Sequence, residues 1–249
     1  MTPGSPVADA RDAALDALRG CVTGMVRTAA VVAGPLGPLH DPAIPVSVAV
    51  EAIGPVPILR IGVTADCPAL TRAGYVAAAG ALGVDTLILV GAGVPTGVLR
   101  EHVGLVAVED HINLTGGSPL IGRHDPLLGP RFPDMSAPYS LRLLESARRY
   151  GTYPGCIYAG CTGAQLRMPG YREWLGSLGA DLAGPWIVPE LLAARQGSMQ
   201  VLAFAVPVGA HSLTATLPAG ETGPVWDRIK GAIVRAVADS HGAGGRVSE

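Results

Sequence analysis

Short runs of apolar, mostly β-branched residues bounded by Gly and Pro constrain this chain more than any other feature. They alternate with segments whose apolar residues recur at helical spacing. The predicted strands are 29–33, 46–50, 56–63, 86–90, 105–108, 156–159 and 199–208, and the predicted helices are 14–25, 68–82, a segment after 136, 171–178, 189–195 and 225–237. Fully apolar strands flanked by helices indicate a sheet covered on both faces. We therefore expect an α/β fold, a three-layer sandwich with a central mixed β-sheet flanked by helices.

The chain reads as one domain. Its 249 residues are 49% hydrophobic and 15% charged, which is typical of a globular protein. No charge run or Ser-rich linker divides the sequence. We expect a single domain over 1–249, with an N-terminal helix within 1–27 and a flexible tail at 240–249.

Charge and hydropathy argue against two classes of partner. The formal net charge is −2 and no basic block occurs, which argues against nucleic acid. The uncharged stretch 196–220 contains Gln196, Gln200, His211 and two prolines, so we expect a buried strand and a loop rather than a membrane span. Residues 1–12 lack the apolar core of a signal peptide, which predicts a cytoplasmic protein.

Neither a metal nor a dinucleotide cofactor is predicted. The six histidines and four cysteines show no ligand spacing, and four cysteines are too few for a disulfide framework. Gly91 to Gly97 is interpreted as a glycine loop after a strand, but Thr96 stands where the dinucleotide fingerprint needs its third glycine, and Pro95 lacks an N–H. We expect no cofactor.

Several motifs in order carry a family resemblance. They are Gly83-Val84-Asp85-Thr86-Leu87, Asp110-His111-Ile112-Asn113-Leu114, Arg131-Phe132-Pro133-Asp134-Met135-Ser136, Gly151-Thr152-Tyr153, Gly179-Ala180-Asp181 and Val188-Pro189-Glu190. Together they closely resemble the trimeric purine nucleoside phosphorylase and methylthioadenosine phosphorylase family over about residues 28 to 240. The resemblance implies a nucleoside phosphorylase-like fold, a homotrimer, and a Phe132 that reaches into a neighbouring subunit's pocket.

The resemblance also identifies the positions where the family binds phosphate. They fall on Pro35, Arg60, Gly62, Ala92 and Trp186, so only Arg60 and Ala92 keep the family residue. Trp186 replaces a hydroxyl and brings one indole N–H donor. The position of the family's ribose-side tyrosine falls on Thr64.

The positions at which the family binds the purine carry neither a polar nor an aromatic side chain in this sequence. Gly163 and Ala164, in the segment that begins Ala159-Gly160-Cys161-Thr162, stand where the family has an aromatic residue and a Glu, and Gly209 stands at its Asn or Asp. Our candidate catalytic residues are His211, an acid or base near neutral pH, and Arg60. The candidate substrate-binding residues are Trp186, Thr64, Ala92, Cys161, Thr162, Gly163, Phe132 and Gly209.

Without the family's phosphate-binding and purine-binding side chains, the electrostatic stabilisation that phosphorolysis requires is absent. The sequence thus favours a phosphorylase-like scaffold recruited to a different small-molecule reaction, in the manner of specialised metabolism. A non-catalytic homologue that binds a ligand or partner is the alternative, and genuine nucleoside phosphorolysis is the second alternative.

Overall fold

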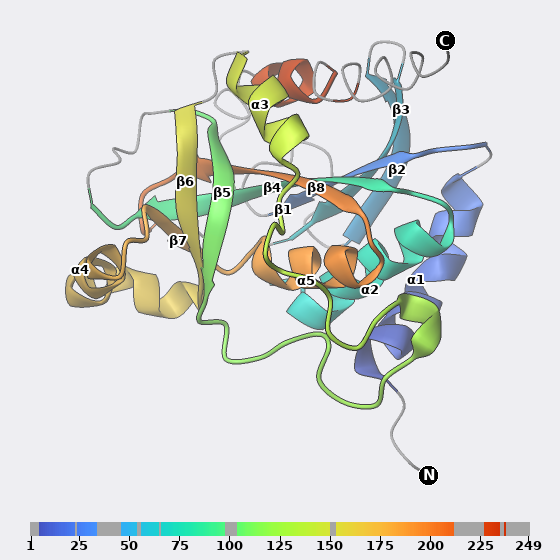
Figure 1. The fold of residues 1–249 in the computed structure, drawn as a ribbon, viewed down its shortest axis with the longest axis horizontal. Helices are drawn as coiled ribbons and strands as arrows, with labels where there is room; N and C mark the ends of the chain where they lie inside the picture. The colour runs from blue at the N-terminus through green and yellow to red at the C-terminus, as the bar shows by residue number, and fades with distance from the viewer. Residues whose placement is uncertain are drawn as a thin grey trace.

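The computed structural model describes residues 5–22, 24–33, 46–53, 56–64, 66–97, 104–149, 153–211, 227–234 and 237. It confirms the α/β class and the mixed central sheet. Figure 1 shows helices on both sides of that sheet, with α1, α2 and α5 on one side and α3 with the helical segment 227–234 on the other. The predicted tail at 240–249 and residues 1–4 lie outside the described residues, so these predictions stay untested.

The strands form one mixed sheet in the order β2-β3-β1-β4-β7-β6-β5-β8. β1 pairs in parallel with β3 and β4, and β4 pairs in parallel with β8. The strands are β1 (Thr28–Ala33), β2 (Val46–Ile53), β3 (Val56–Val63), β4 (Thr86–Pro95), β5 (Val106–Asn113), β6 (Tyr153–Gly160), β7 (Leu182–Gly184) and β8 (Gln200–Pro207).

The helices fall where apolar residues at helical spacing predicted them, except that the first spans 6–21 rather than 14–25, so Met25 lies outside it and is 84% exposed. They are α1 (Pro6–Cys21), α2 (Ala69–Ala81), α3 (Leu141–Arg149), α4 (Pro169–Ser177) and α5 (Val188–Gln196). α1 and α5 both pack on α2, which is rich in alanine. In the C-terminal helical segment, Ile229, Ile233 and Val237 are buried as the spacing predicted, whereas Val225 lies outside the described residues.

β4 is longer than predicted, and this extension closes part of the sheet. β4 pairs with both β7 and β8, so that β4, β7, β6, β5 and β8 form a closed ring of strands. The interpretation of Gly91 onward as a loop is therefore wrong, because the strand continues to Pro95. Gly91 and Gly93 of this strand lie against bulky side chains, so a larger residue would not fit at either position without a shift of these neighbours. A Cβ on Gly91 would lie 3.2 Å from the Trp186 Cβ, and one on Gly93 would lie 3.2 Å from the Tyr158 ring.

Among the described residues, no helix is both long enough and apolar enough to cross a membrane. The uncharged stretch that begins at Gln196 is the end of α5 followed by β8, as far as residue 211. β8 is central and buried on both faces from Val201 to Pro207, which explains its continuous apolar sequence.

Candidate functional site

The parallel strands bring several predicted site residues to one edge of the sheet. β3, β1, β4 and β8 run in the same direction, so their carboxyl ends lie together. Ala92 is in register with Val206, and the Val208 N–H donates to the Gly93 carbonyl over 2.9 Å. Thr64 directly follows β3, and Gly209 follows β8 by two residues. In open α/β sheets this edge is where ligands bind.

Arg60 lies farther back in the sheet. It is in register with Ala30 of β1, which is in register with Ile88 of β4, four residues before Ala92. Arg60 is 7% exposed, and its Nε donates to Glu51 Oε1 over 2.6 Å. A Cβ on Gly62 would lie 2.6 Å from Ser47 Oγ, so β2 closely covers this side of β3. The charge of Arg60 is balanced within the sheet.

Trp186 lies in the turn between β7 and α5. It is 1% exposed, and it is one of the largest fully buried side chains of the described chain. Its ring therefore presents no open wall in this structure, and its role as a ligand contact stays a prediction. The indole Nε1 is buried without a hydrogen-bond partner. An unsatisfied buried donor of this kind costs free energy.

Tyr158 joins β6 to β4 and to the Trp186 turn. Its Oη donates to the Ala92 carbonyl over 2.8 Å, and the Trp186 backbone N–H faces the Tyr158 hydroxyl oxygen. Burial raises the pKa of Tyr158 well above its usual range, so the phenol is a neutral donor. The carbonyl of Ala92, a predicted binding residue, is therefore already engaged.

The backbone at Ile187 is strained. Its φ is 75° and its ψ is −56°, and the Val188 N–H donates to the Trp186 carbonyl over 2.9 Å. These angles and this bond define a γ-turn of positive φ, which is rare even for residues without a branched Cβ. Such strain persists only where surrounding contacts enforce it, and it clusters at functional sites.

A buried ion pair supports this turn. Arg72 of α2 is 4% exposed and Glu190 of α5 is 1% exposed, and the Arg72 Nε donates to Glu190 Oε1. The other guanidinium nitrogens donate to the Cys67 carbonyl over 2.5 Å and to the Pro185 carbonyl over 2.9 Å. Our sequence reasoning missed Arg72. The signal was a lone charge in a helix that is otherwise almost entirely apolar or small.

The segment after β6 lies beside the Trp186 turn. The Cys161 N–H donates to the Gly184 carbonyl over 2.9 Å, and the Thr162 hydroxyl donates to Gln165 Oε1 over 2.8 Å. Gly163 begins a short 3-10 helix. Cys161 is buried, and desolvation raises the pKa of its thiol to about 11, which disfavours a nucleophilic thiolate at neutral pH.

Two further predicted residues are exposed. Phe132 is 87% exposed in the long segment between β5 and α3. His211 is exposed on the turn after β8, two residues beyond Gly209. Its predicted role as acid or base is not tested by this position.

His111 behaves as a structural residue. Its ring packs edge-on against Tyr139 with 5.9 Å between centroids, and its Nδ1 is buried without a hydrogen-bond partner, 4.0 Å from Asp110 Oδ1. Desolvation lowers the pKa of His111, and the nearby Asp110 opposes the shift. Within the described ranges no group of three His, Cys, Asp or Glu side chains could hold a metal ion.

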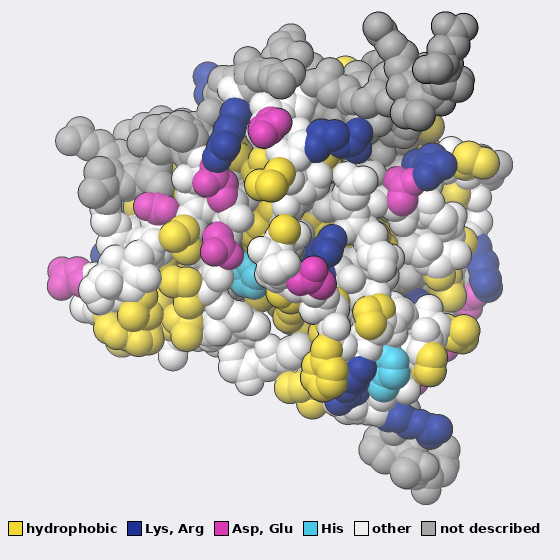
Figure 2. Space-filling model, viewed as in Figure 1, with side chains coloured by type: hydrophobic (Ala, Val, Ile, Leu, Met, Phe, Trp, Pro, Cys, Tyr) yellow, Lys and Arg dark blue, Asp and Glu magenta, His cyan; other side chains and the backbone are white. Residues whose placement is uncertain are grey.

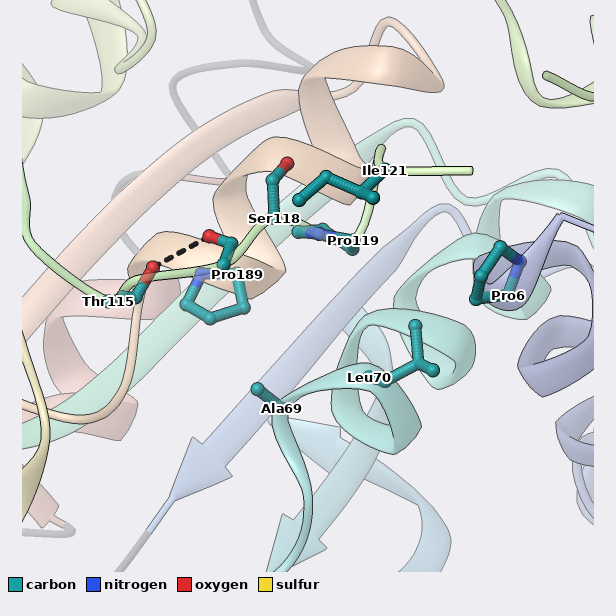
Figure 3. Close-up of a pocket in the computed structure, with 9 residues that line it drawn as sticks. Pro6, Ala69, Leu70, Thr115, Ser118, Pro119, Ile121 and Pro189 are labelled. Carbon is teal, nitrogen blue, oxygen red and sulfur yellow. Dashed lines mark hydrogen bonds between the residues drawn. The ribbon is translucent and has the colours of Figure 1, made fainter. Parts of the chain in front are cut away.

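A groove of about 320 Å³ opens elsewhere on the molecule. Figure 3 shows it between the start of α2, residues 115–121, Pro6 and Pro189, and its lining is mostly apolar. The Thr115 hydroxyl at its rim donates to the Gly117 carbonyl over 2.8 Å. None of the predicted site residues lines this groove.

The visible surface carries no basic stripe. Figure 2 shows Lys and Arg side chains interspersed with acidic ones on this face, and hydrophobic side chains gathered over α4. On and around that helix Met168, Trp174 and Leu178 are 52%, 48% and 46% exposed.

No protein-family model matches the chain. Among curated proteins it is 39% identical over 127 residues to purine nucleoside phosphorylase 1 of Geobacillus stearothermophilus, covering 49% of this chain and 46% of the relative. It is 30% identical over 164 residues to purine nucleoside phosphorylase 1 of Bacillus subtilis strain 168, covering 63% and 60%. The aligned part thus spans about half the length of these relatives.

Solved structures match over nearly the whole fold. Isoform 2 of the purine nucleoside phosphorylase from Schistosoma mansoni, in complex with cytosine and ribose-1-phosphate, superimposes with a TM-score of 0.72 at 18% identity, covering 95% of this chain and 96% of that one. The Schistosoma enzyme in complex with guanosine also has a TM-score of 0.72. These findings confirm the resemblance: the chain is related to the purine nucleoside phosphorylases in sequence and has their fold.

Proposed function

We propose that this homologue of the purine nucleoside phosphorylases binds a small ligand at the carboxyl edge of β3, β4 and β8 and acts on it by a reaction other than purine nucleoside phosphorolysis. The observation that carries the proposal is the buried Trp186, which stands where the family resemblance implies a phosphate-binding hydroxyl. The ligand is neutral or singly anionic, because this edge does not offer what a dianion requires.

The charge and the volume available at this edge disfavour a phosphate dianion. A bound phosphate dianion needs cationic and hydroxyl donors aimed at its oxygens. The charge of Arg60 is already balanced by Glu51 at 2.6 Å, and Gly62 brings no side chain. The Trp186 indole fills the volume that a small hydroxyl side chain would leave to the anion. Arg60 can still face the polar edge of a less charged ligand.

The positions at which the family binds the purine lack polar side chains in this chain. A leaving purine gains negative charge, which the enzyme must stabilise through hydrogen bonds. Gly163, Ala164 and Gly209 have no side-chain donor or acceptor at the corresponding positions. Cys161 and Thr162 remain as neighbours of a ligand, and the Trp186 indole supplies an aromatic face on which a ring can stack.

Phosphorolysis of purine nucleosides is the second candidate function. It is favoured by the curated relatives, which are named purine nucleoside phosphorylases, and by the solved neighbours with guanosine or ribose-1-phosphate bound. We rank it second because the sequence similarity covers about half of each relative and the substituted positions are those that carry the chemistry.

Phosphorolysis assays separate these two functions. We expect no base release from inosine, guanosine, adenosine or methylthioadenosine with inorganic phosphate at rates near the ~10 per second of a median enzyme. Chromatography of the free base measures the outcome, with an authentic purine nucleoside phosphorylase as the positive control. Turnover at an ordinary enzyme's rate would refute the assignment of the phosphate and purine positions and establish the second candidate.

His211→Gln separates an enzyme from a binding homologue. If His211 is the acid or base, the variant keeps ligand binding and loses about 10²–10⁴-fold in turnover, the usual contribution of such a group. His124→Gln is the matched control, because His124 lies in a different loop. Once a substrate is found by screening, equal turnover of the variant and the wild type would remove His211 from the catalytic residues.

The remaining expectations belong to the same proposal. A single domain that assembles as a homotrimer would place the exposed Phe132 at a neighbouring subunit's site, as the family resemblance implies. A cytoplasmic location and a place in specialised metabolism are part of the proposal as well.

A further inference from the structure

The Trp186 turn has an unusual set of supports. The strained γ-turn at Ile187 joins a buried indole without a hydrogen bond of its own to the first turn of α5. Three contacts fix its backbone: the Tyr158 hydroxyl at the Trp186 N–H, the packing of Trp186 on Gly91, and the Arg72 guanidinium at the Pro185 carbonyl. The third comes from α2, outside the strand ring.

Arg72 holds the turn at both of its ends. One guanidinium nitrogen donates to the Pro185 carbonyl before the γ-turn, and another donates to the Glu190 carboxylate after it. A third donates to the Cys67 carbonyl, which ties the guanidinium to the start of α2. A planar group that spans three acceptors fixes their separation, which a flexible ammonium does not do.

We propose that the Arg72–Glu190 pair is a positioning device that maintains the strained turn and thereby sets the orientation of Trp186. The inference deepens the proposed function, because it names the residues that hold its ligand-binding indole. A buried ion pair adds little stability relative to an apolar replacement of similar volume, so a fold that retains one needs another reason for it. The strained turn supplies that reason.

The test reports on Trp186 without any ligand or turnover. The chain has three tryptophans, so Trp174→Phe and Trp226→Phe leave Trp186 as the sole indole emitter. In that background we compare Arg72→Met, Arg72→Lys and the double variant Arg72→Met/Glu190→Leu, using emission wavelength and acrylamide quenching. Arg27→Met is the control, because Arg27 is an exposed cation paired with Asp85 far from the turn in sequence.

The double variant decides between positioning and bulk stability. It leaves no unpaired buried charge, so we expect its urea midpoint to lie close to the background's, while quenching of Trp186 rises severalfold and its emission shifts to longer wavelength. Quenching of Trp186 in Arg72→Lys should lie between that of the background and that of the double variant. Lysine keeps the positive charge but lacks the planar guanidinium that bonds three acceptors at once. Arg27→Met should match the background.

Two outcomes would overturn the proposal. One is a double variant that regains stability with the buried emission and low quenching of the background, which would make the pair a structural contact only. The other is Arg72→Lys with unchanged quenching, which decides the matter even if the Arg72→Met variants fail to fold. Because no substrate enters the measurement, failure of the proposed function would leave this result standing.

Discussion

Trp186→Ser is expected to lower the free energy of unfolding by about 3–5 kcal/mol, the range for removing a buried large aromatic side chain. Trp186 is 1% exposed and packs on Gly91. Because glycine has no side chain, Gly91 offers no atoms that could fill the cavity left by the indole. The serine hydroxyl would add an unsatisfied polar group to the cavity. Urea unfolding followed by far-UV circular dichroism measures the loss.

Trp174→Ser is the matched control. Trp174 is 48% exposed on α4, so the same substitution there should cost far less than at Trp186. The folded fraction of Trp186→Ser should still not phosphorolyse purine nucleosides, because Ala164 and Gly209 lack the purine-side groups. If Trp186→Ser were as stable as Trp174→Ser, the indole would not be the core residue described above.

The local pattern of the sequence predicted most of the fold. β3 spans the predicted 56–63, and α2 begins and ends one residue inside the predicted 68–82, because apolar period and Pro or Gly boundaries agree there. The second half of β4 was missed. Its Gly91 and Gly93 look like a loop in the sequence, and only the side chains that pack against them from β6 and the Trp186 turn explain them.

The candidate site was less predictable for a related reason. Thr64, Ala92 and Gly209, which were aligned by motif, lie toward the carboxyl edge of neighbouring parallel strands, and strands of this kind are local features of the sequence. The Arg72–Glu190 contact joins residues 118 apart, and nothing in the spacing of either residue announces the other. The positive φ of Ile187 is likewise invisible, because a β-branched residue is the last that propensity would place there.

Gly184→Ala is expected to destabilise the fold at or above the upper end of the about 1–3 kcal/mol typical of overpacking. A Cβ at Gly184 would overlap the Tyr158 hydroxyl and lie 2.7 Å from the Ala92 carbonyl oxygen. Tyr158 is wholly buried and bonded to that carbonyl, so neither neighbour can move without opening the strand ring. Gly170→Ala is the control, since nothing lies within 4 Å of its Cβ and it is helical.

Tyr158→Phe tests whether the Tyr158 hydroxyl is the group that excludes a Cβ at Gly184. Alone, it removes a buried hydrogen bond to Ala92 and should cost about 1–3 kcal/mol. Combined with Gly184→Ala, it removes the overlapping hydroxyl, so the double variant should be more stable than the sum of the two single effects predicts. The contact with the Ala92 oxygen persists, and the rescue is therefore partial. Strict additivity in urea unfolding would mean that Gly184 is small for the sake of the Ala92 backbone alone, and that Tyr158 does not set the spacing between β7 and β4.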